Sequence, residues 1–241
     1  MPTWKLIDSG PNLGAYNMAV DEELLARAQA GAVAPVFRLY TWDPPAVSLG
    51  RFQKLETSVK AGACRRLGFD IVRRSTGGRA VLHHKELTYS IIGRVDDPLF
   101  PRDVLGTYKV IAAGLLSGLR NLGLPAEMVS RAGRHAALVQ KKAKEPACFS
   151  SPSWYELLVN GKKIIGSAQR RASNAFLQHG SILMDYDPLL EAEVIPGGCA
   201  GDVVTSIKRE LGREVPLETI KAAFLNGFVE ALGIEFTSGK V

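Results

Sequence analysis

Cys148 carries the most reactive type of side chain in this sequence, and its neighbours favour a thiolate. It lies in EPACFSSPSWYE, residues 145–156, where Pro146 and Pro152 restrain the backbone. Three lysines between positions 141 and 144 precede it, so the local field is positive. Positive charge lowers the pKa of a thiol and raises the thiolate fraction that a nucleophile needs. From these residues alone, the alternative is a solvated basic loop with one buried, inert cysteine.

Lys163 is a second candidate, in GKKIIGSAQRR, residues 161–171. Consecutive residues on a strand point to opposite faces, so one of Lys162 and Lys163 projects into the working face of a sheet and the other into solvent. A lysine in such a place can polarise a carbonyl or stabilise a nearby thiolate. An exposed hairpin pair is the alternative, although the small residues 166–168 leave room for a ligand against the backbone.

A glycine turn is the third candidate, in RRSTGGRAVLHH, residues 73–84. Gly77 and Gly78 between two strands let backbone N–H groups approach a ligand closely. Arg73, Arg74 and Arg79 add positive charge for a carboxylate, a phosphate or a developing oxyanion. A tight hairpin with solvated arginines is equally consistent with the spacing. The segment matches neither GxxxxGK[ST] nor GxGxxG.

Histidines give weaker signals. The adjacent His83 and His84 point to opposite faces of a strand, so only one of them can serve a given site. His179, in QHGSI, is by itself more typical of a hydrogen-bonded structural histidine. No constellation of Asp or Glu accompanies the adjacent pair, so we expect no metal site.

The net charge and the cysteine content exclude several classes of protein for this chain. The chain of 241 residues has a net charge of +6, which suits an acidic partner, but no helix-turn-helix, zinc-finger or RNP pattern predicts nucleic-acid binding. The cysteines at 64, 148 and 199 form no CxxC pair, so neither a disulfide framework nor a cysteine zinc site is supported. No apolar run is long enough for a membrane span or a signal peptide. We therefore expect a cytoplasmic protein that contacts no membrane.

The elements that must position these residues mix strands with helices. Helical spacing predicts helices over 15–30, 55–67, 104–122 and 216–232. Short apolar runs predict strands over 4–7, 36–40, 46–49, 70–73, 80–83, 87–92, 155–159, 163–168 and 176–184, with a hairpin at Asn160-Gly161. Because no regular βαβ alternation occurs, we predict an α+β fold around a mixed, largely antiparallel sheet flanked by helices. No linker-like stretch divides the chain.

In combination and in this order, the motifs resemble the lipoate-protein ligase and octanoyltransferase superfamily, which shares its catalytic-domain fold with biotin-protein ligases. The resemblance is carried by RRSTGGRAVLHH, ACFSSPSWYEL, KKIIGSAQRR and LQHGSI, together with YNMAVDEELL and WDPPAVSLGRFQ nearer the N-terminus. It covers about residues 4–210, and the helix of 216–232 follows it. It implies one catalytic domain over residues 1–241 with the biotin/lipoate-protein ligase fold.

ATP-dependent ligases of this superfamily share the glycine turn and the K-x-x-G-S-A lysine but generally lack a cysteine at the ACF position. The resemblance therefore implies the cysteine-dependent branch, in which octanoyl arrives as a thioester of acyl carrier protein and goes to a lysine of a lipoyl domain, such as that of glycine cleavage H protein. Cys148 would be the nucleophile. Lys163 would lower the pKa of Cys148 and orient the thioester carbonyl. We expect a monomer that needs no ATP, metal or other cofactor and binds no nucleic acid.

The resemblance also implies a set of substrate-binding residues in the glycine turn and in two later strands. They are Arg74, Thr76, Gly77, Gly78, Arg79, His83, Gly166, Ser167, Ala168, His179 and Gly180. Backbone N–H groups near Gly77, Gly78 and Ala168 are expected to help hold the oxyanion. His84 stands where the family often has an acidic residue, so no role is carried over for it.

A second cysteine is set aside by its position. One class of octanoyltransferase places its nucleophile in a proline-cysteine-glycine turn ahead of Val-Thr-Ser, and here that slot falls on Gly197, two residues before Cys199. The alternatives are an octanoyl amidotransferase acting between lipoyl domains and an ATP-dependent lipoate-protein ligase. If the chain is not an enzyme, the alternatives are a protein that binds lipoyl domains and a basic protein that binds nucleic acid.

Overall fold

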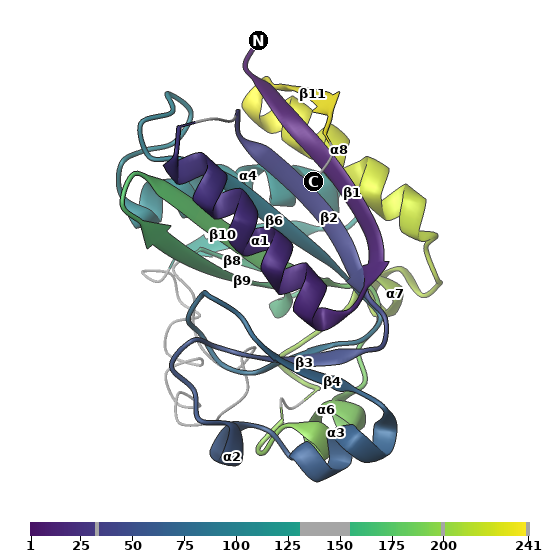
Figure 1. The fold of residues 1–241 in the computed structure, drawn as a ribbon. Helices are drawn as coiled ribbons and strands as arrows, with labels where there is room; N and C mark the ends of the chain where they lie inside the picture. The colour runs from purple at the N-terminus through teal and green to yellow at the C-terminus, as the bar shows by residue number, and fades with distance from the viewer. Residues whose placement is uncertain (32–33, 131–154, 199–200, 240–241) are drawn as a thin grey trace.

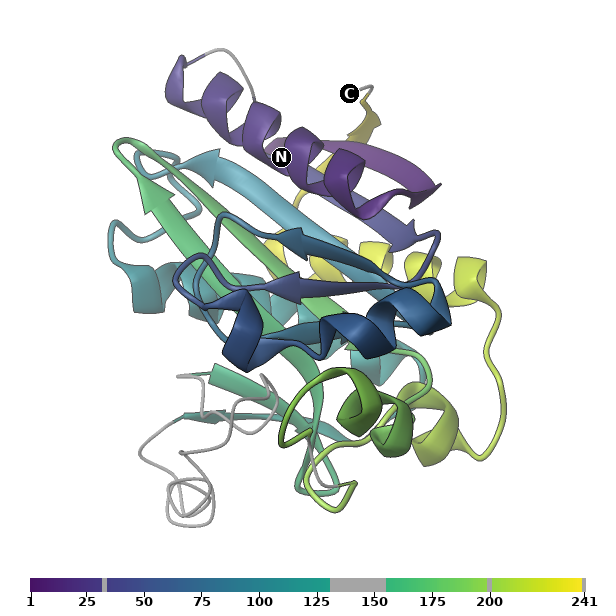
Figure 2. The ribbon, with the colours of Figure 1, turned by 60° about the horizontal axis from the view of Figure 1, so that its bottom comes forward.

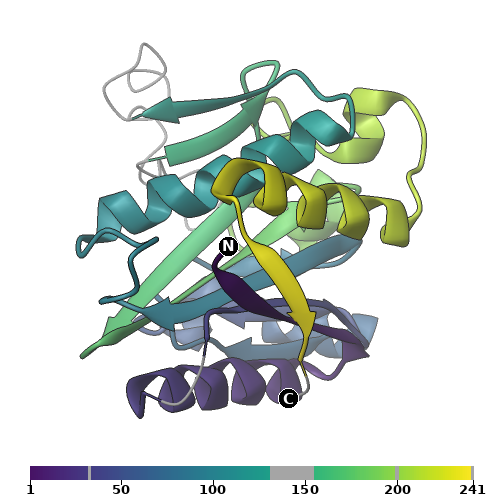
Figure 3. The same cartoon turned by 90° about the horizontal axis from the view of Figure 1, so that it is seen from above.

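The computed structural model describes residues 1–31, 34–130, 155–198 and 201–239. An eight-stranded sheet forms the middle layer, with α4 (Val104–Asn121) and α8 (Leu217–Leu232) on one face and α1 (Gly14–Gln29) and a small sheet on the other (Figures 1 and 3). Its strands, in spatial order, are β11 (Glu235–Ser238), β1 (Thr3–Asn12), β2 (Val36–Trp42), β6 (Glu86–Arg94), β10 (Ala175–Leu183), β9 (Lys162–Ala172), β8 (Tyr155–Val159) and β7 (Ala126–Ser130).

In this eight-stranded sheet, β1 pairs in parallel with β2 and with β11, whereas the five other neighbouring pairs are antiparallel. The predicted α+β class with a mixed, largely antiparallel sheet is therefore confirmed. Asn160 and Gly161 form the predicted tight connection between β8 and β9, both with positive φ. That backbone conformation is the one that Asn-Gly turns favour.

Alternating side chains give the central sheet two different faces. In β2, Phe37 and Leu39 join the main hydrophobic core with residues of α4 and α8, whereas Arg38 reaches Asp21 of α1 on the other face. Since the period of a strand is two residues, β6 and β10 likewise send Thr88 and His179 to the α1 side. The α1 side thus carries the polar residues from which the site is built.

The main core lies between the sheet and two helices that touch at glycines. Helix α4 (Val104–Asn121) and helix α8 (Leu217–Leu232) approach so closely that a Cβ on Gly227 would lie 2.3 Å from the Gly118 nitrogen. Phe224 and Phe228 of α8 fill the space left by Gly118 and Gly114. The glycines therefore allow both helices to lie flat on one sheet face.

The small sheet has the order β4 (Asp70–Arg73), β3 (Ala46–Leu49), β5 (Val81–His83). Figure 2 shows β3 and β4 alongside the central sheet, with α2 (Leu55–Ser58) and α3 (Ala61–Leu67) on their outer side. The remaining helices are α1 (Gly14–Gln29), α6 (Pro188–Val194) and α7 (Ile207–Leu211). No helix within the described ranges is long and apolar enough to cross a bilayer.

The structure corrects two expectations. The helix predicted over 55–67 is two helices, because Val59 is extended at the break and the Lys60 N–H bonds to the Val194 carbonyl, 2.8 Å away, instead of continuing a helix. The hairpin reading of the glycine turn is also wrong: β3 lies between β4 and β5, so the turn crosses over β3. Four elements were not predicted, namely β7, α6, α7 and β11.

Candidate active site

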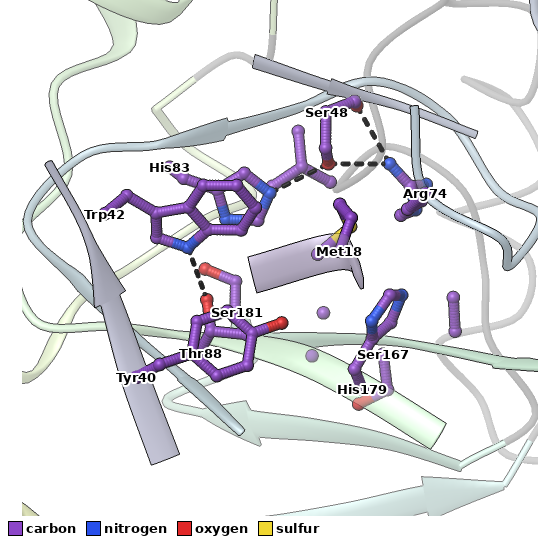
Figure 4. Close-up of a pocket in the computed structure, with 14 residues that line it drawn as sticks. Met18, Tyr40, Trp42, Ser48, Arg74, His83, Thr88, Ser167, His179 and Ser181 are labelled. Atoms are coloured by element: carbon purple, nitrogen blue, oxygen red, sulfur yellow. Dashed lines mark hydrogen bonds between the residues drawn. The ribbon is translucent and has the colours of Figure 1, made fainter. Parts of the chain in front are cut away.

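A pocket lies where the polar face of the central sheet meets the small sheet, with about 370 Å³ of empty space when the solvent at its mouth is included (Figure 4). Strands β2, β6, β9 and β10 supply one side, β3 and β5 the other, and α1 contributes Met18 to the lining. The lining residues are Met18, Tyr40, Trp42, Ser48, Arg74, Val81, His83, Thr88, Gly166, Ser167, Ala168, His179, Gly180 and Ser181.

Seven of the predicted substrate-binding residues line this pocket: Arg74, His83, Gly166, Ser167, Ala168, His179 and Gly180. Segments about a hundred residues apart in the sequence therefore meet as expected. Thr76 does not line the pocket, but its hydroxyl is bonded to His179 Nε2 at 2.6 Å. Gly77, Gly78 and Arg79 belong to the turn that Arg74 holds in place, and they are absent from the lining.

His83 sits on one wall of the pocket between a hydroxyl and a carboxylate. Its Nε2 is 2.8 Å from Ser48 Oγ, and its Nδ1 is 3.1 Å from Glu86 Oε1. The Trp42 indole stacks on the imidazole with 4.0 Å between ring centroids. Burial lowers the pKa of His83, and the hydrogen bond with Glu86 offsets this only in part. The imidazole is therefore neutral at pH 7 and able to accept a proton.

His179 of β10 also lies between a hydroxyl and a carboxylate. Its Nδ1 is 3.2 Å from Asp21 Oδ2, and the Asp21 carboxylate also accepts hydrogen bonds from Arg38, Tyr40 and Ser90. Burial alone would raise the pKa of Asp21, but the His179 hydrogen bond and the charge of Arg38 outweigh it and leave that pKa lowered. Asp21 is thus a buried carboxylate whose charge is matched by its neighbours.

Arg74 fastens the glycine turn to β3. Its Nη1 donates to the Ser48 carbonyl at 2.9 Å and to Ser48 Oγ at 3.0 Å, and its Nη2 donates to the carbonyls of Gly77 and Arg79 at 2.9 and 2.6 Å. The turn also packs closely on Gly50, where a Cβ would lie 2.0 Å from the Gly78 oxygen. The Arg74 guanidinium therefore shapes the turn, and its contact with a substrate stays a prediction.

Lys163 is buried, as the alternation of β9 predicts, while Lys162 is more exposed. Its Nζ donates to Glu156 Oε1 of β8 at 3.0 Å. The Lys163 backbone pairs with residues 203–205, through its N–H to the Val203 carbonyl and its carbonyl to the Thr205 N–H. Lys163 is not among the residues that line the pocket. Glu156, which the sequence reasoning did not single out, is the partner that holds its ammonium group.

Cys148 lies outside the described residues, as do Cys199 and the lysines at 141, 142 and 144. Its role as nucleophile therefore stays a prediction. Cys64 is buried against α6 in the cluster under the small sheet, where burial raises the pKa of its thiol. A raised pKa is typical of a structural cysteine rather than a nucleophile.

Several lining residues were missed by the sequence reasoning. Met18 and Ser48 lie in the two N-terminal segments that carried the family resemblance, yet no role was assigned to either. Tyr40, Thr88 and Ser181 could have been found from alternation, because each lies on the same strand face as a polar neighbour two residues away. In the part of the chain that is described, no cluster of His, Cys, Asp or Glu is placed to hold a metal ion.

Comparison with known proteins places this chain in a family. Residues 14–229 match the lipoyl protein ligase A/B catalytic domain, and the chain belongs to that family. The resemblance read from the motifs is thereby confirmed.

Among its relatives, the octanoyltransferase LipM of Kyrpidia tusciae is 41% identical over 100% of this chain and 91% of its own length. The octanoyltransferase LipM of Carboxydothermus hydrogenoformans is 44% identical over 98% and 89%. Among solved structures, lipoate-protein ligase A bound with ATP has a TM-score of 0.80 at 23% identity, covering 99% of this chain and 89% of that one. A putative lipoate protein ligase from T. acidophilum has a TM-score of 0.78 at 24%, with the same coverage. These structures confirm the fold.

Proposed function

We propose that this chain is an octanoyltransferase of lipoate biosynthesis, which moves octanoyl from the thioester of acyl carrier protein to a lysine of a lipoyl domain. The observation that carries the proposal is that the glycine-turn, β9 and β10 motifs meet at one pocket in a chain whose relatives are octanoyltransferases over nearly their full length. The chain is accordingly an acyltransferase enzyme. Residues 1–241 are taken as a single catalytic domain.

The reaction that we infer has two steps. The Cys148 thiolate attacks the carbonyl carbon of the donor thioester, and the carrier's thiol leaves, so that the octanoyl group remains on Cys148 as a thioester. The ε-amine of the acceptor lysine then attacks the same carbonyl carbon, forms an amide and releases Cys148. Lys163 is the group that we expect to favour the Cys148 thiolate, and its ion pair with Glu156 holds it in place.

The pocket suits the acyl part of the substrate. Met18, Tyr40, Trp42 and Val81 give its walls apolar surface, whereas His83 and His179 supply polar atoms. Backbone N–H groups near Gly77, Gly78 and Ala168 are expected to stabilise the oxyanion of each tetrahedral intermediate. Loss of one such donor typically costs about a hundredfold in rate.

We expect acyl carrier protein as donor and lipoyl-domain proteins as acceptors, such as glycine cleavage H protein and subunits of 2-oxo acid dehydrogenases. The donor thioester is already activated, so we expect no requirement for ATP or a metal. The working form is expected to be a cytoplasmic monomer.

The test is a transfer assay with purified components. The chain is mixed with octanoyl-acyl carrier protein and apo H protein without ATP, and the H protein is followed by intact mass. We expect one octanoyl group on the H protein. Transfer that occurs only with ATP and free octanoate would overturn the proposal in favour of a ligase, and transfer only from octanoylated H protein would make the chain an amidotransferase.

A further inference from the structure

Ser48, His83 and Glu86 form a hydrogen-bonded chain at the pocket, and neither step of the transfer through Cys148 assigns it a proton transfer. Ser48 Oγ is 2.8 Å from His83 Nε2, and His83 Nδ1 is 3.1 Å from Glu86 Oε1. All three side chains are buried, and Ser48 and His83 line the pocket (Figure 4). A hydroxyl, an imidazole and a carboxylate in this order are the parts of a nucleophile, its general base and the group that orients the base.

The two small strands and one tight turn bring these residues together. In the antiparallel pair of β3 and β5, Ser48 pairs with Val81 and Ala46 with His83, so Ser48 and His83 are diagonal neighbours on one face. Lys85 has a φ of 52° in the short connection between β5 and β6, across which His83 and Glu86 are in hydrogen-bond contact. A positive φ is uncommon for a residue other than glycine. The backbone therefore specifies this juxtaposition.

The hydrogen-bond directions suit a serine nucleophile. Glu86 Oε1 accepts a hydrogen bond from the Thr88 hydroxyl, so the His83 Nδ1 that faces the same oxygen carries the proton, and Nε2 is left as an acceptor for the Ser48 hydroxyl. Arg74 Nη1 can only donate, and it occupies one of the two lone pairs of Ser48 Oγ. The second lone pair remains for attack on a carbonyl carbon. The Trp42 ring, stacked on His83, keeps the imidazole in this orientation.

The pocket also offers a hydroxyl to a substrate. Ser181 lines the same pocket, and its buried hydroxyl has no hydrogen-bond partner in the described part of the chain. A buried polar group without a partner is costly, and a bound carbonyl oxygen would satisfy it. The Nη hydrogens of Arg74 are donated to Ser48, Gly77 and Arg79, so the guanidinium adds positive charge beside Ser48 Oγ, and the Ser181 hydroxyl can donate to a polar atom of a substrate in the pocket.

We propose that Ser48 is a second nucleophile, through which the pocket hydrolyses medium-chain acyl esters and thioesters without Cys148. Ser48 Oγ attacks the acyl carbonyl carbon while its proton moves to His83 Nε2. The bond from that carbon to the leaving oxygen or sulfur breaks, and the alcohol or thiol departs with the proton from His83. Water then attacks the acyl-serine, giving its proton to His83. The fatty acid leaves, and Ser48 takes the proton back.

The test uses the full chain with Cys148→Ala, so that hydrolysis cannot arise from the proposed acyl-cysteine. The substrates are p-nitrophenyl octanoate and the octanoyl thioester of N-acetylcysteamine, followed by release of nitrophenol or thiol. We expect hydrolysis above the enzyme-free rate, and a loss of roughly a hundredfold when Ser48→Ala or His83→Gln is added. Ser58→Ala, a buried serine of α2 outside the pocket, is the matched control and should leave the rate unchanged.

A second measurement does not depend on the folding of any Ser48 variant. The Cys148→Ala protein is treated with an alkyl fluorophosphonate, which labels activated serines, and the modified peptide is located by mass spectrometry. Label on Ser48 is the expected result. Label elsewhere, no label, or hydrolysis that survives Ser48→Ala in a folded protein would overturn the assignment. Octanoyl transfer by the wild-type chain is scored separately, so failure of this proposal and failure of the transferase proposal are distinguishable.

Discussion

At the scale of residues, the pocket is held by two imidazoles, each bonded to a hydroxyl at one nitrogen and to a carboxylate at the other. Ser48, His83 and Glu86 make one such chain, and Thr76, His179 and Asp21 make the other. Each hydroxyl belongs to a segment that shapes the pocket, β3 or the glycine turn. The two carboxylates therefore fix the positions of the pocket walls through the histidines.

Asp21 should be a large contributor to stability. Asp21→Asn removes the charge that compensates the fully buried Arg38, which would leave a buried cation without its ion pair. Breaking a buried pair from one side typically costs about 3–5 kcal/mol. The free energy of unfolding in urea measures this loss, with Glu22→Gln, an exposed neighbour on α1, as the control. Equal stability of the two variants would contradict the role given to Asp21.

His83 should make stability depend on pH. Burial lowers its pKa in the folded chain, whereas in the unfolded chain the imidazole returns to about 6.5. The unfolded state thus binds more protons below that pH, and the free energy of unfolding should fall as the pH drops through about 6.5. Urea unfolding at pH values on either side of 6.5 should show a smaller drop for His83→Gln, which does not titrate. An unchanged drop would mean that other groups cause it.

At the scale of elements, the contact between α4 and α8 depends on glycine rather than on side-chain fit. Gly227→Ala places a Cβ 2.3 Å from the backbone nitrogen of Gly118, which cannot move aside as a flexible side chain would. We expect this change to lower the free energy of unfolding by about 2 kcal/mol.

Gly62→Ala in α3 is the matched control for Gly227→Ala. Its Cβ would meet nothing within 4 Å, so the better helix propensity of alanine should raise stability by up to about 1 kcal/mol. Thermal or urea unfolding compares the two variants. Similar effects of both substitutions would show that helix propensity, not the close approach of α4 and α8, decides the outcome.

The elements also show what the sequence could and could not predict. Alternation and turn residues were enough for β8, the Asn160-Gly161 turn and β9, because their signals are local. The place of β3 between β4 and β5 is decided by pairing across the chain, which no local pattern records. Lys163 was found by its motif, but its partner Glu156 was not, because the register of β8 on β9 shifts between Leu157 and Leu158 and no turn residue predicts that shift.

At the scale of the whole molecule, the net charge of +6 favours an acidic donor protein. The Arg51 N–H bonds to the Thr76 carbonyl at 2.8 Å, so the exposed Arg51, Phe52 and Lys54 lie beside the glycine turn of the pocket. Phe52 is 84% exposed and gives this basic surface an apolar residue. A carrier protein that docks here would deliver its acyl group next to the site.

Salt should therefore weaken transfer from a protein donor more than from a small donor. Raising the ionic strength screens contacts between exposed charges, whereas the octanoyl thioester of N-acetylcysteamine has no charged surface to dock. As the ionic strength rises, we expect kcat/KM with octanoyl-acyl carrier protein to fall several-fold more steeply than kcat/KM with the small thioester. Arg51→Glu combined with Lys54→Glu should reproduce the loss at low salt for the protein donor alone. Equal salt sensitivity of both donors would contradict electrostatic docking.

The central claim is that octanoyl is carried on Cys148 without ATP, and one measurement tests it most directly. The wild-type chain and Cys148→Ala are each mixed with octanoyl-acyl carrier protein, quenched in acid, and examined by intact mass and peptide mapping. In the wild-type chain we expect one octanoyl group on Cys148, and addition of apo H protein should remove it. In Cys148→Ala we expect no adduct at position 148 and no transfer to the H protein. Full transfer activity in Cys148→Ala would contradict it.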